Sequence, residues 1–145
     1  MLTLAKYNAI RRRHAQPIVK EVCALLGITK QPVFDRVSRR RGYSNRLRFS
    51  VPLWATIDED YFTHYVIHET LHSLSKTDGH CKLFRLAEEV INRHFGFELI
   101  YATIKPNEDE PYPVEIWRND KLVFTRTLAQ KYSAKADKLR RLLGC

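Results

Sequence analysis

The sequence predicts an α+β fold in which a small sheet packs against two central helices. Three observations lead to this prediction. The chain has 145 residues, of which 44% are hydrophobic, so it can bury one core. Apolar residues recur at helical spacing near the N-terminus, in the middle and, more weakly, near the C-terminus. Short segments between them alternate apolar and polar residues, which is typical of strands.

The first third of the chain is expected to form a helix followed by a strand pair. Apolar residues predict a helix over residues 8–26, which Gly27 ends. Residues 31–52 predict a hairpin of two strands around a basic turn. The second strand alternates, so one set of side chains is expected to point inward and the other outward. The inward set is Leu47, Phe49 and Val51, and the outward set is Arg46, Arg48 and Ser50.

A central helix is expected over residues 57–75. Thr56 and Glu59 have the spacing of a capping box, and acidic side chains in the first turn suit the helix dipole. Apolar residues point in several directions around this helix, which predicts that the rest of the domain encloses it. Polar side chains within the helix therefore need a specific partner or role.

A second, amphipathic helix is expected to begin at His80, after a turn over residues 75–79, and to end at Gly96. Residues 97–104 then predict a strand, and residues 106–113 an acidic loop. The apolar face of the helix is expected to pack against the core. That face consists of Leu83, Phe84, Ala87, Val90, Ile91 and Phe95.

The C-terminal segment predicts a hairpin that turns at Asn119 and Asp120, followed by a basic helical segment over residues 128–143. On this basis we divide the chain into a core of residues 1–105 and a C-terminal part of residues 106–145.

Positive charge is concentrated in the first third of the chain. The formal net charge is +9, and residues 1–50 carry 12 basic and 2 acidic side chains. Clustered basic residues attract phosphates, so a nonspecific, salt-sensitive contact with DNA is one interpretation and a solvated basic surface is the other. The candidate nucleic-acid residues are Arg39, Arg40, Arg41, Tyr43, Arg46 and Arg48. A second contact is expected from Lys131, Lys135, Lys138, Arg140 and Arg141.

The cysteines and the N-terminus favour an intracellular, cytoplasmic protein. Cys23, Cys81 and Cys145 are odd in number and form no CxxC pair, so neither a disulfide framework nor a cysteine zinc site is expected. The N-terminus lacks the apolar segment of a signal peptide, and no run of about 18 apolar residues predicts a membrane span.

Residues 68–72 read His-Glu-Thr-Leu-His, the HExxH pattern, in the middle of the central helix. Residues four apart lie on one face of a helix, so His68 and His72 can bind the same zinc ion. Glu69 lies about 100° further round the helix than His68, close to the metal without being a ligand. Such a carboxylate acts as a general base toward a water molecule whose pKa the zinc lowers.

A catalytic zinc ion needs three protein ligands and an open position. His80 is the first candidate for the third ligand, because it can return to the metal from the start of the next helix. Asp78, Glu88 and Glu89 are the carboxylate alternatives, with a helix cap and a solvated helix face as their structural interpretations. His64 lies about 12 Å of helix rise from the far histidine, so we expect a structural role for it.

The run HETLHSLSKTDGHCKLF resembles the active-site segment of SprT-like zinc metallopeptidases and of related peptidases of the YgjP and Wss1 types. The likeness consists of HExxH, a Gly-His pair and a phenylalanine four residues after that histidine, within residues 33–95. It implies a zincin-like α+β fold, with His68, His72 and His80 as the ligands of one zinc ion and Glu69 as the catalytic base. Several SprT-like peptidases cleave proteins bound or crosslinked to DNA, which implies a substrate of that class.

The C-terminal part departs from the SprT-like pattern. Many of those proteins carry a four-cysteine zinc ribbon after the peptidase core, whereas the hairpin expected over residues 114–127 has no cysteine. We therefore expect no second zinc ion and interpret the hairpin as a ribbon without metal.

Two further parts of a peptidase site have candidates in the sequence. A substrate chain is commonly held by pairing with an exposed strand, and residues 46–51 are the candidate edge, an interior strand being the alternative. The oxyanion of the reaction needs a hydrogen-bond donor besides zinc. The candidates are Tyr61, Tyr65, His94 and Tyr101.

These patterns together predict a zinc-dependent metallopeptidase that acts on DNA-associated or DNA-crosslinked proteins. Two other classes remain open. One is an ImmA-like regulatory peptidase that cleaves a single repressor, and the other is a DNA-binding protein with a zinc site but no turnover. A purely structural histidine cluster would bind no metal.

Overall fold

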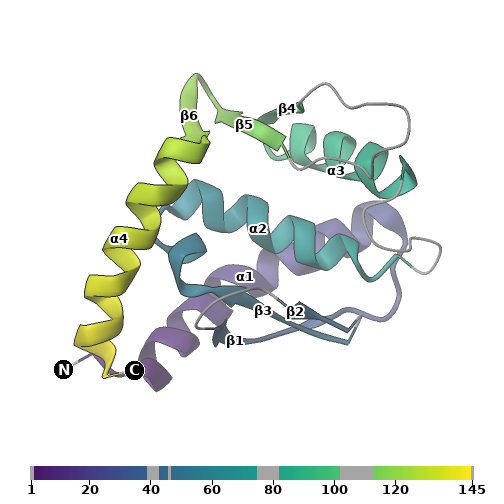
Figure 1. Cartoon of the computed structure of the whole chain (residues 1–145). Helices are drawn as coiled ribbons and strands as arrows, with labels where there is room; N and C mark the ends of the chain where they lie inside the picture. Colours follow the sequence, from purple (N-terminus) through teal and green to yellow (C-terminus); the bar gives the residue numbers. More distant parts are fainter. Residues whose placement is uncertain (1, 39–42, 46, 75–81, 102–112, 145) are drawn as a thin grey trace.

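The computed structural model describes residues 2–38, 43–45, 47–74, 82–101 and 113–144. Within these residues the protein forms an α+β fold of four α-helices, one 3-10 helix and two three-stranded sheets (Figure 1). In chain order the elements are α1 (Leu4–Leu26), β1 (Val33–Ser38), β2 (Tyr43–Ser44), β3 (Arg48–Pro52), the 3-10 helix η1 (Leu53–Thr56), α2 (Glu59–Leu71), α3 (Lys82–His94), β4 (Phe97–Tyr101), β5 (Pro113–Arg118), β6 (Lys121–Phe124) and α4 (Arg126–Leu143).

The N-terminal helix is confirmed and begins four residues earlier than predicted. Thr3 caps it, because its side chain accepts a hydrogen bond from the backbone N–H of Lys6. Gly27 ends the helix in the left-handed conformation, as predicted. Pro17 lies inside α1.

The first sheet differs from the predicted hairpin. β1 pairs with β3 in parallel, and β2 pairs with the other side of β3 in antiparallel orientation, so the strand order is β1-β3-β2. Ser50 is buried beside Phe49 and Val51, although its alternation predicted exposure. Leu47 precedes β3 and is 50% exposed, so its predicted inward position is wrong.

The middle position of β3 also corrects the predicted edge strand. β3 pairs with β1 along its length and with β2 at Phe49 and Ser50, so it is an interior strand of this sheet and not an edge. Within the described residues, the edges of this sheet are β1 and β2.

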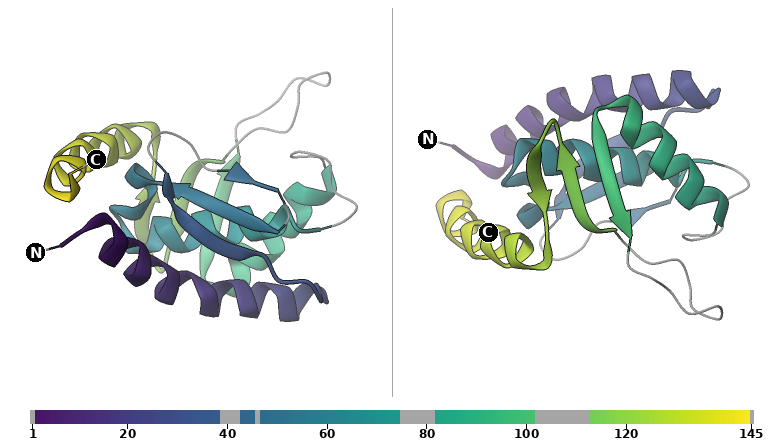
Figure 2. Two further views of the ribbon diagram at one scale, coloured as in Figure 1. Left: turned by 90° about the horizontal axis from the view of Figure 1, so that it is seen from below. Right: turned by 90° about the horizontal axis from the view of Figure 1, so that it is seen from above.

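The helix α2 runs through the centre of the molecule. The first sheet and α1 lie on one side of it, and α3 and the second sheet lie on the other (Figures 1 and 2). Ten of its 13 residues are buried, which confirms that the rest of the protein encloses it. Apolar side chains of α2, chiefly Phe62, Val66, Ile67 and Leu71, form the middle of the core.

Both ends of α2 differ from the prediction. The N-cap is Asp58, whose side chain accepts from the backbone N–H of Tyr61. Thr56 cannot serve, because its hydroxyl bonds the carbonyl of Leu53 at 2.7 Å and the hydroxyl of Tyr7 at 2.5 Å. The helix ends at Leu71, four residues before the predicted end.

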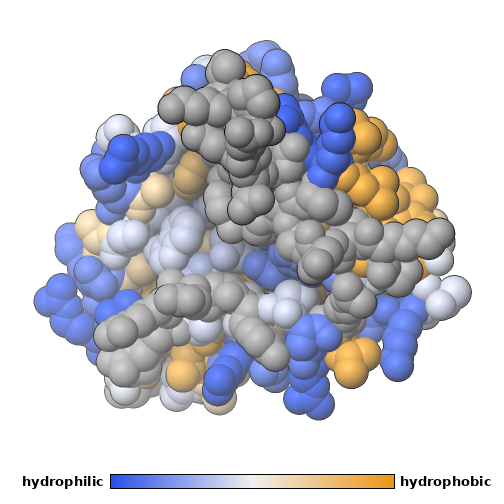
Figure 3. All heavy atoms as spheres, turned by 45° about the vertical axis from the view of Figure 1, so that its right-hand side comes forward, coloured by the Kyte–Doolittle hydropathy of each residue, from blue (hydrophilic) through white to orange (hydrophobic). Residues whose placement is uncertain are grey.

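The amphipathic helix is confirmed from Lys82 onward, and its predicted buried face is confirmed in part: Ala87 and Phe95 also pack against the core, whereas Leu83 and Val90 do not. Phe84 and Ile91 are buried as expected, together with Glu88 and Asn92. Three apolar residues of α3 lie outside the core, namely Leu83, Leu86 and Val90, which are 49%, 56% and 61% exposed. Figure 3 shows apolar side chains gathered at the surface on the side of the molecule that it brings forward.

The second sheet is built from β4, β5 and β6 in that order, with antiparallel pairing throughout. The predicted C-terminal hairpin is confirmed. Asn119 and Asp120 both have positive φ, as the tight turn of a two-residue hairpin requires. Arg118 and Lys121, on either side of this turn, bond to Asp60 in the first turn of α2 at 2.8 and 2.9 Å.

The last helix packs against η1 and β6. Thr125 caps it, and the hydroxyl of Tyr132 donates to the carbonyl of Val123. Ala136 and Leu143 are also buried, so α4 contributes to the same hydrophobic core as the preceding elements.

Candidate metal and catalytic site

The two histidines of the HExxH pattern lie at the C-terminal end of α2. His68 is in the last turn of the helix, and His72 is the C-cap residue. Their ring centres are 5.1 Å apart, and the ring planes are 80° to each other. The four-residue spacing thus brings the two imidazoles together, as the sequence predicts.

This pair of side chains fits a zinc ion. Two imidazoles bound through Nε2 to one tetrahedral zinc ion at about 2.1 Å would have ring centres about 5 Å apart. Phe84 packs against both rings, with its ring centre 5.1 Å from that of His68 and 4.7 Å from that of His72. The spacing of the two ring centres is therefore compatible with a shared ion, and a buried side chain packs on both rings.

The predicted third ligand, His80, and its alternative Asp78 lie outside the described residues. Within the part of the chain that the structure describes, no three His, Cys, Asp or Glu side chains are grouped to hold a metal ion.

Glu69 is a buried carboxylate at 6% exposure. Burial raises its pKa to about 7, although the neighbouring positive charge of His68 acts in the opposite direction. No hydrogen bond joins its side chain to another described residue. A carboxyl group with a pKa near neutrality can both accept and return a proton at physiological pH.

Glu88 has a position that the sequence did not predict. The sequence predicts either a metal ligand or part of a solvated helix face at this position, yet only 3% of Glu88 is exposed. Its Oε2 lies 2.7 Å from Nδ1 of His68, and the hydroxyl of Tyr101 donates to its Oε1 at 2.7 Å. The solvated-face interpretation suits its neighbour Glu89, which lies 3.6 Å from Arg85.

The contact between His68 and Glu88 changes the pKa of both groups. Burial opposes the charged form of each, but their hydrogen bond and mutual attraction outweigh it. The pKa of His68 is raised, and the pKa of Glu88 is lowered. Because the bond uses Nδ1, Nε2 is the atom of His68 that would bind a metal.

His64 has the structural position that the sequence predicts. It is buried, and its Nδ1 lies 2.9 Å from Oδ1 of Asn92, whose amide in turn donates to the backbone carbonyl of Glu88. Burial is the main effect on His64 and lowers its pKa, so the ring is neutral at pH 7.

The sequence contains a signal for the buried positions of Glu88 and Asn92. Phe84, Glu88 and Asn92 are each four residues apart, so Glu88 and Asn92 lie on the same buried face of α3 as Phe84. Tyr101 has no comparable signal, because its contact with Glu88 depends on the second sheet.

The four candidate oxyanion donors are dispersed. Tyr101 donates to Glu88, and the ring of Tyr65 lies 6.1 Å from that of His68. Tyr61 is stacked on Phe124 at 4.9 Å within the core. His94 is at the far end of α3, and its Nε2 lies 2.9 Å from Glu21 of α1.

Most of the candidate nucleic-acid residues lie outside the described part of the chain. These are Arg39, Arg40, Arg41 and Arg46. For Tyr43, the structure describes only that the residue lies in β2. Arg48 is exposed, with its guanidinium 3.9 Å from the carboxylate of Asp35.

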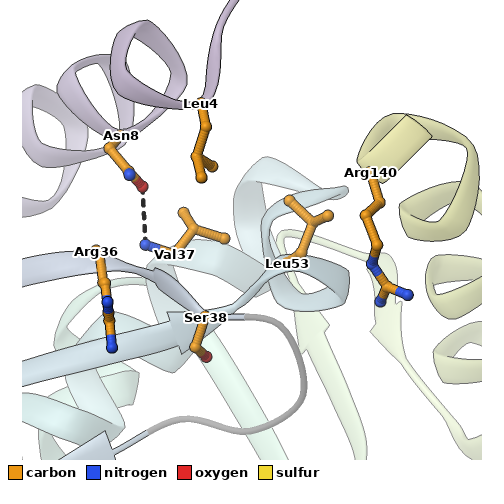
Figure 4. A pocket seen from close by; sticks show the side chains of 7 residues that line it. All are labelled: Leu4, Asn8, Arg36, Val37, Ser38, Leu53 and Arg140. Atoms are coloured by element: carbon orange, nitrogen blue, oxygen red, sulfur yellow. Dashed lines mark hydrogen bonds between the residues drawn. The ribbon is translucent and has the colours of Figure 1, made fainter. Parts of the chain in front are cut away.

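A pocket of about 290 Å³ lies between α1, the end of β1, η1 and α4 (Figure 4). Arg36 and Arg140 lie at opposite sides of the view, with the apolar side chains of Leu4, Val37 and Leu53 between them. No acidic side chain is among the described residues that line it. Those residues are Leu4, Asn8, Arg36, Val37, Ser38, Leu53 and Arg140.

No protein-family model, curated protein or solved structure matches the chain. None of the described helices is both long and apolar enough to span a bilayer.

Proposed function

We propose that this protein is a zincin-like metallopeptidase, in which Glu69 is the catalytic base and His68, His72 and His80 hold one zinc ion. The proposal rests on the arrangement of side chains at the C-terminal end of α2. Two imidazoles a helical turn apart, with ring centres 5.1 Å apart, flank a buried carboxylate whose pKa is about 7. The packing of α2 between a three-stranded sheet and α3 supports a zincin-like fold.

The chemistry follows from the residue types. When bound, zinc polarises the scissile carbonyl and makes water more acidic. The Glu69 carboxylate accepts a proton from the attacking water as the bond between water oxygen and carbonyl carbon forms. It then passes that proton to the amide nitrogen as the carbon–nitrogen bond breaks, which releases an amine and a carboxylic acid, and the acid then loses its proton to the solvent.

The test compares the wild type with Glu69→Gln, His80→Ala and the exposed control Glu98→Gln. Zinc content is measured by mass spectrometry, and cleavage is measured on casein and on a DNA–protein crosslink. We expect Glu69→Gln to keep its zinc and lose activity by a factor on the order of 10² to 10⁴. His80→Ala should lose zinc, and Glu98→Gln should match the wild type.

Two results would contradict the proposal. An active Glu69→Gln variant would exclude Glu69 as the base, and a wild type without stoichiometric zinc would exclude the metal site. Zinc and DNA binding without cleavage of either substrate would favour the zinc-containing DNA-binding protein instead.

We also infer that the peptidase acts on DNA-associated proteins, through a nonspecific contact with a DNA strand. The support is the pocket in Figure 4, where two guanidinium groups flank an apolar surface. Guanidinium groups pair with phosphates, and an apolar surface can receive a sugar or an unpaired base. Arg39, Arg40 and Arg41 follow the pocket residue Ser38 directly in the sequence.

Fluorescence anisotropy with a labelled single-stranded oligonucleotide tests this contact. The double variant Arg36→Gln/Arg140→Gln should bind more weakly, and the negative slope of log K against log salt should become shallower by about 1.4, since each phosphate contact contributes about −0.7. The control is Arg13→Gln, an exposed arginine of α1. A salt slope that is unchanged in the double variant, or equally reduced in the control, would refute the pocket as a phosphate contact.

A further inference from the structure

Two polar pairs join α2 to α3 in the same way. His68 pairs with Glu88, and His64 pairs with Asn92. The partners are four residues apart on each helix, and all four side chains are buried. Each histidine uses Nδ1 in its pair, so the two imidazoles receive equivalent support from α3.

The two pairs differ in the charge of the acceptor. His64, which we assign a structural role, has a neutral amide as its partner. His68, the proposed zinc ligand, has a carboxylate. Burial of a carboxylate is costly unless it is paired, and an apolar side chain would suit this face of α3, between Phe84 and Ile91. A neutral partner is sufficient to fix a buried histidine, as His64 shows, so the charge at position 88 needs another explanation.

Tyr101 completes the arrangement from a third element, β4. Its hydroxyl donates to Oε1 of Glu88 at 2.7 Å, while Oε2 is 2.7 Å from His68. The guanidinium of Arg85 lies 4.4 Å from the centre of the Tyr101 ring and covers it. Both oxygens of Glu88 are thus bonded, and the carboxylate is held in a single orientation toward His68.

We propose that Glu88 is a positioning residue for His68, which it orients as a metal ligand, and that Tyr101 in turn positions Glu88. An acceptor at Nδ1 places the ring hydrogen there and directs the Nε2 lone pair outward. A negative acceptor also makes the imidazole a stronger donor to a metal. This inference rests on the proposed function for its metal, but the orientation of the His68 ring belongs to the metal-free protein as well.

The first test measures zinc affinity by competition with a chromophoric chelator. Loss of such a partner weakens metal binding by about 10-fold to 100-fold, and we expect that loss in Glu88→Leu. Glu88→Gln keeps an oxygen that can accept from Nδ1 but loses the charge, so its affinity should fall between those of Glu88→Leu and the wild type. Tyr101→Phe keeps the carboxylate and should have a smaller effect. Glu89→Gln is the matched control, because it removes the same charge from the next position of α3 and should bind zinc as the wild type does.

The second test separates positioning from a structural role. Glu88→Leu fills a similar volume but leaves Nδ1 of His68 and the hydroxyl of Tyr101 without an acceptor, so the metal-free variant is expected to melt below the wild type. The readout that a purely structural role would not move is therefore the position of the ring hydrogen on His68. Long-range nitrogen–proton NMR on the metal-free protein, at a pH where the ring is neutral, reports which nitrogen of His68 carries the hydrogen. We expect Nδ1 in the wild type and a shift toward Nε2 in Glu88→Leu.

The outcomes distinguish this inference from the proposed function. A wild type that binds no zinc contradicts the peptidase, whereas the NMR experiment still tests Glu88. A wild-type His68 with its hydrogen on Nε2 would overturn the positioning role. So would wild-type zinc affinity in Glu88→Leu, or an equal loss in Glu89→Gln.

Discussion

Phe84→Ala tests whether the packing of α3 on the two histidines contributes to the stability of the fold. Phe84 is 1% exposed and contacts both His68 and His72. A buried phenylalanine removes about 200 Å² from water, which at about 25 cal/mol per Å² corresponds to about 5 kcal/mol. Truncations of this kind cost about 3–5 kcal/mol. Since the free energy of unfolding of a domain is about 5–15 kcal/mol, the variant should lose a large fraction of its stability.

The assay is urea unfolding followed by circular dichroism, with the midpoint and the slope fitted for each variant. Leu83→Ala is the matched control, because Leu83 is the preceding residue of α3 and is 49% exposed. We expect it to cost less than about 1 kcal/mol. The reasoning would be refuted if both variants lost about 1 kcal/mol or less, because Phe84 would then not be packed as the structure has it.

Two other predictions concern the junction between the second sheet and its neighbouring helices. Burial raises the pKa of Asp60, but the hydrogen bonds from Lys121 and Arg118 outweigh burial and lower it. The stabilisation should therefore be present above the unfolded-state pKa of about 3.9 and disappear as the pH falls through the lower folded-state pKa. Asp60→Asn should melt below the wild type at pH 7, with a smaller difference at pH 3, and a larger difference at pH 3 would contradict this. Gly96 has a φ of +86°, and a Cβ there would lie 3.3 Å from Oδ1 of Asn119, so Gly96→Ala should lower the free energy of unfolding by about 1–2 kcal/mol. Gly144→Ala is the control, because Gly144 has a φ of +73° but no atom within 4 Å of the added Cβ, and an equal loss in both variants would exclude the contact with Asn119.

Local patterns were sufficient to predict most of the elements. Gly27 at the end of α1 and the Asn119–Asp120 turn act through neighbouring residues, so each could be found in a short stretch of sequence, whereas the cap at Thr3 was missed. The same holds for the pairing of His68 with His72, because a four-residue spacing on a helix fixes their relative position.

Other predictions failed because they depended on contacts between distant segments. Thr56 has the spacing of a capping residue, but Tyr7 of α1 bonds its hydroxyl and Asp58 takes the cap. The alternation of residues 46–51 predicts a strand with one buried face. It cannot report that β1 and β2 pair on both sides of β3, or that Ser50 is buried.

The sequence by itself determined that a central helix carries two histidines and a glutamate in the order required for a zinc site. Only the tertiary structure decided how this helix is supported. Glu88 lies 20 residues after His68 in the sequence, and Tyr101 lies 33 residues after His68. The three side chains meet because α3 packs on α2 and β4 follows α3. Spacing within a helix is set by backbone geometry, whereas contacts between elements depend on how their buried faces pack together.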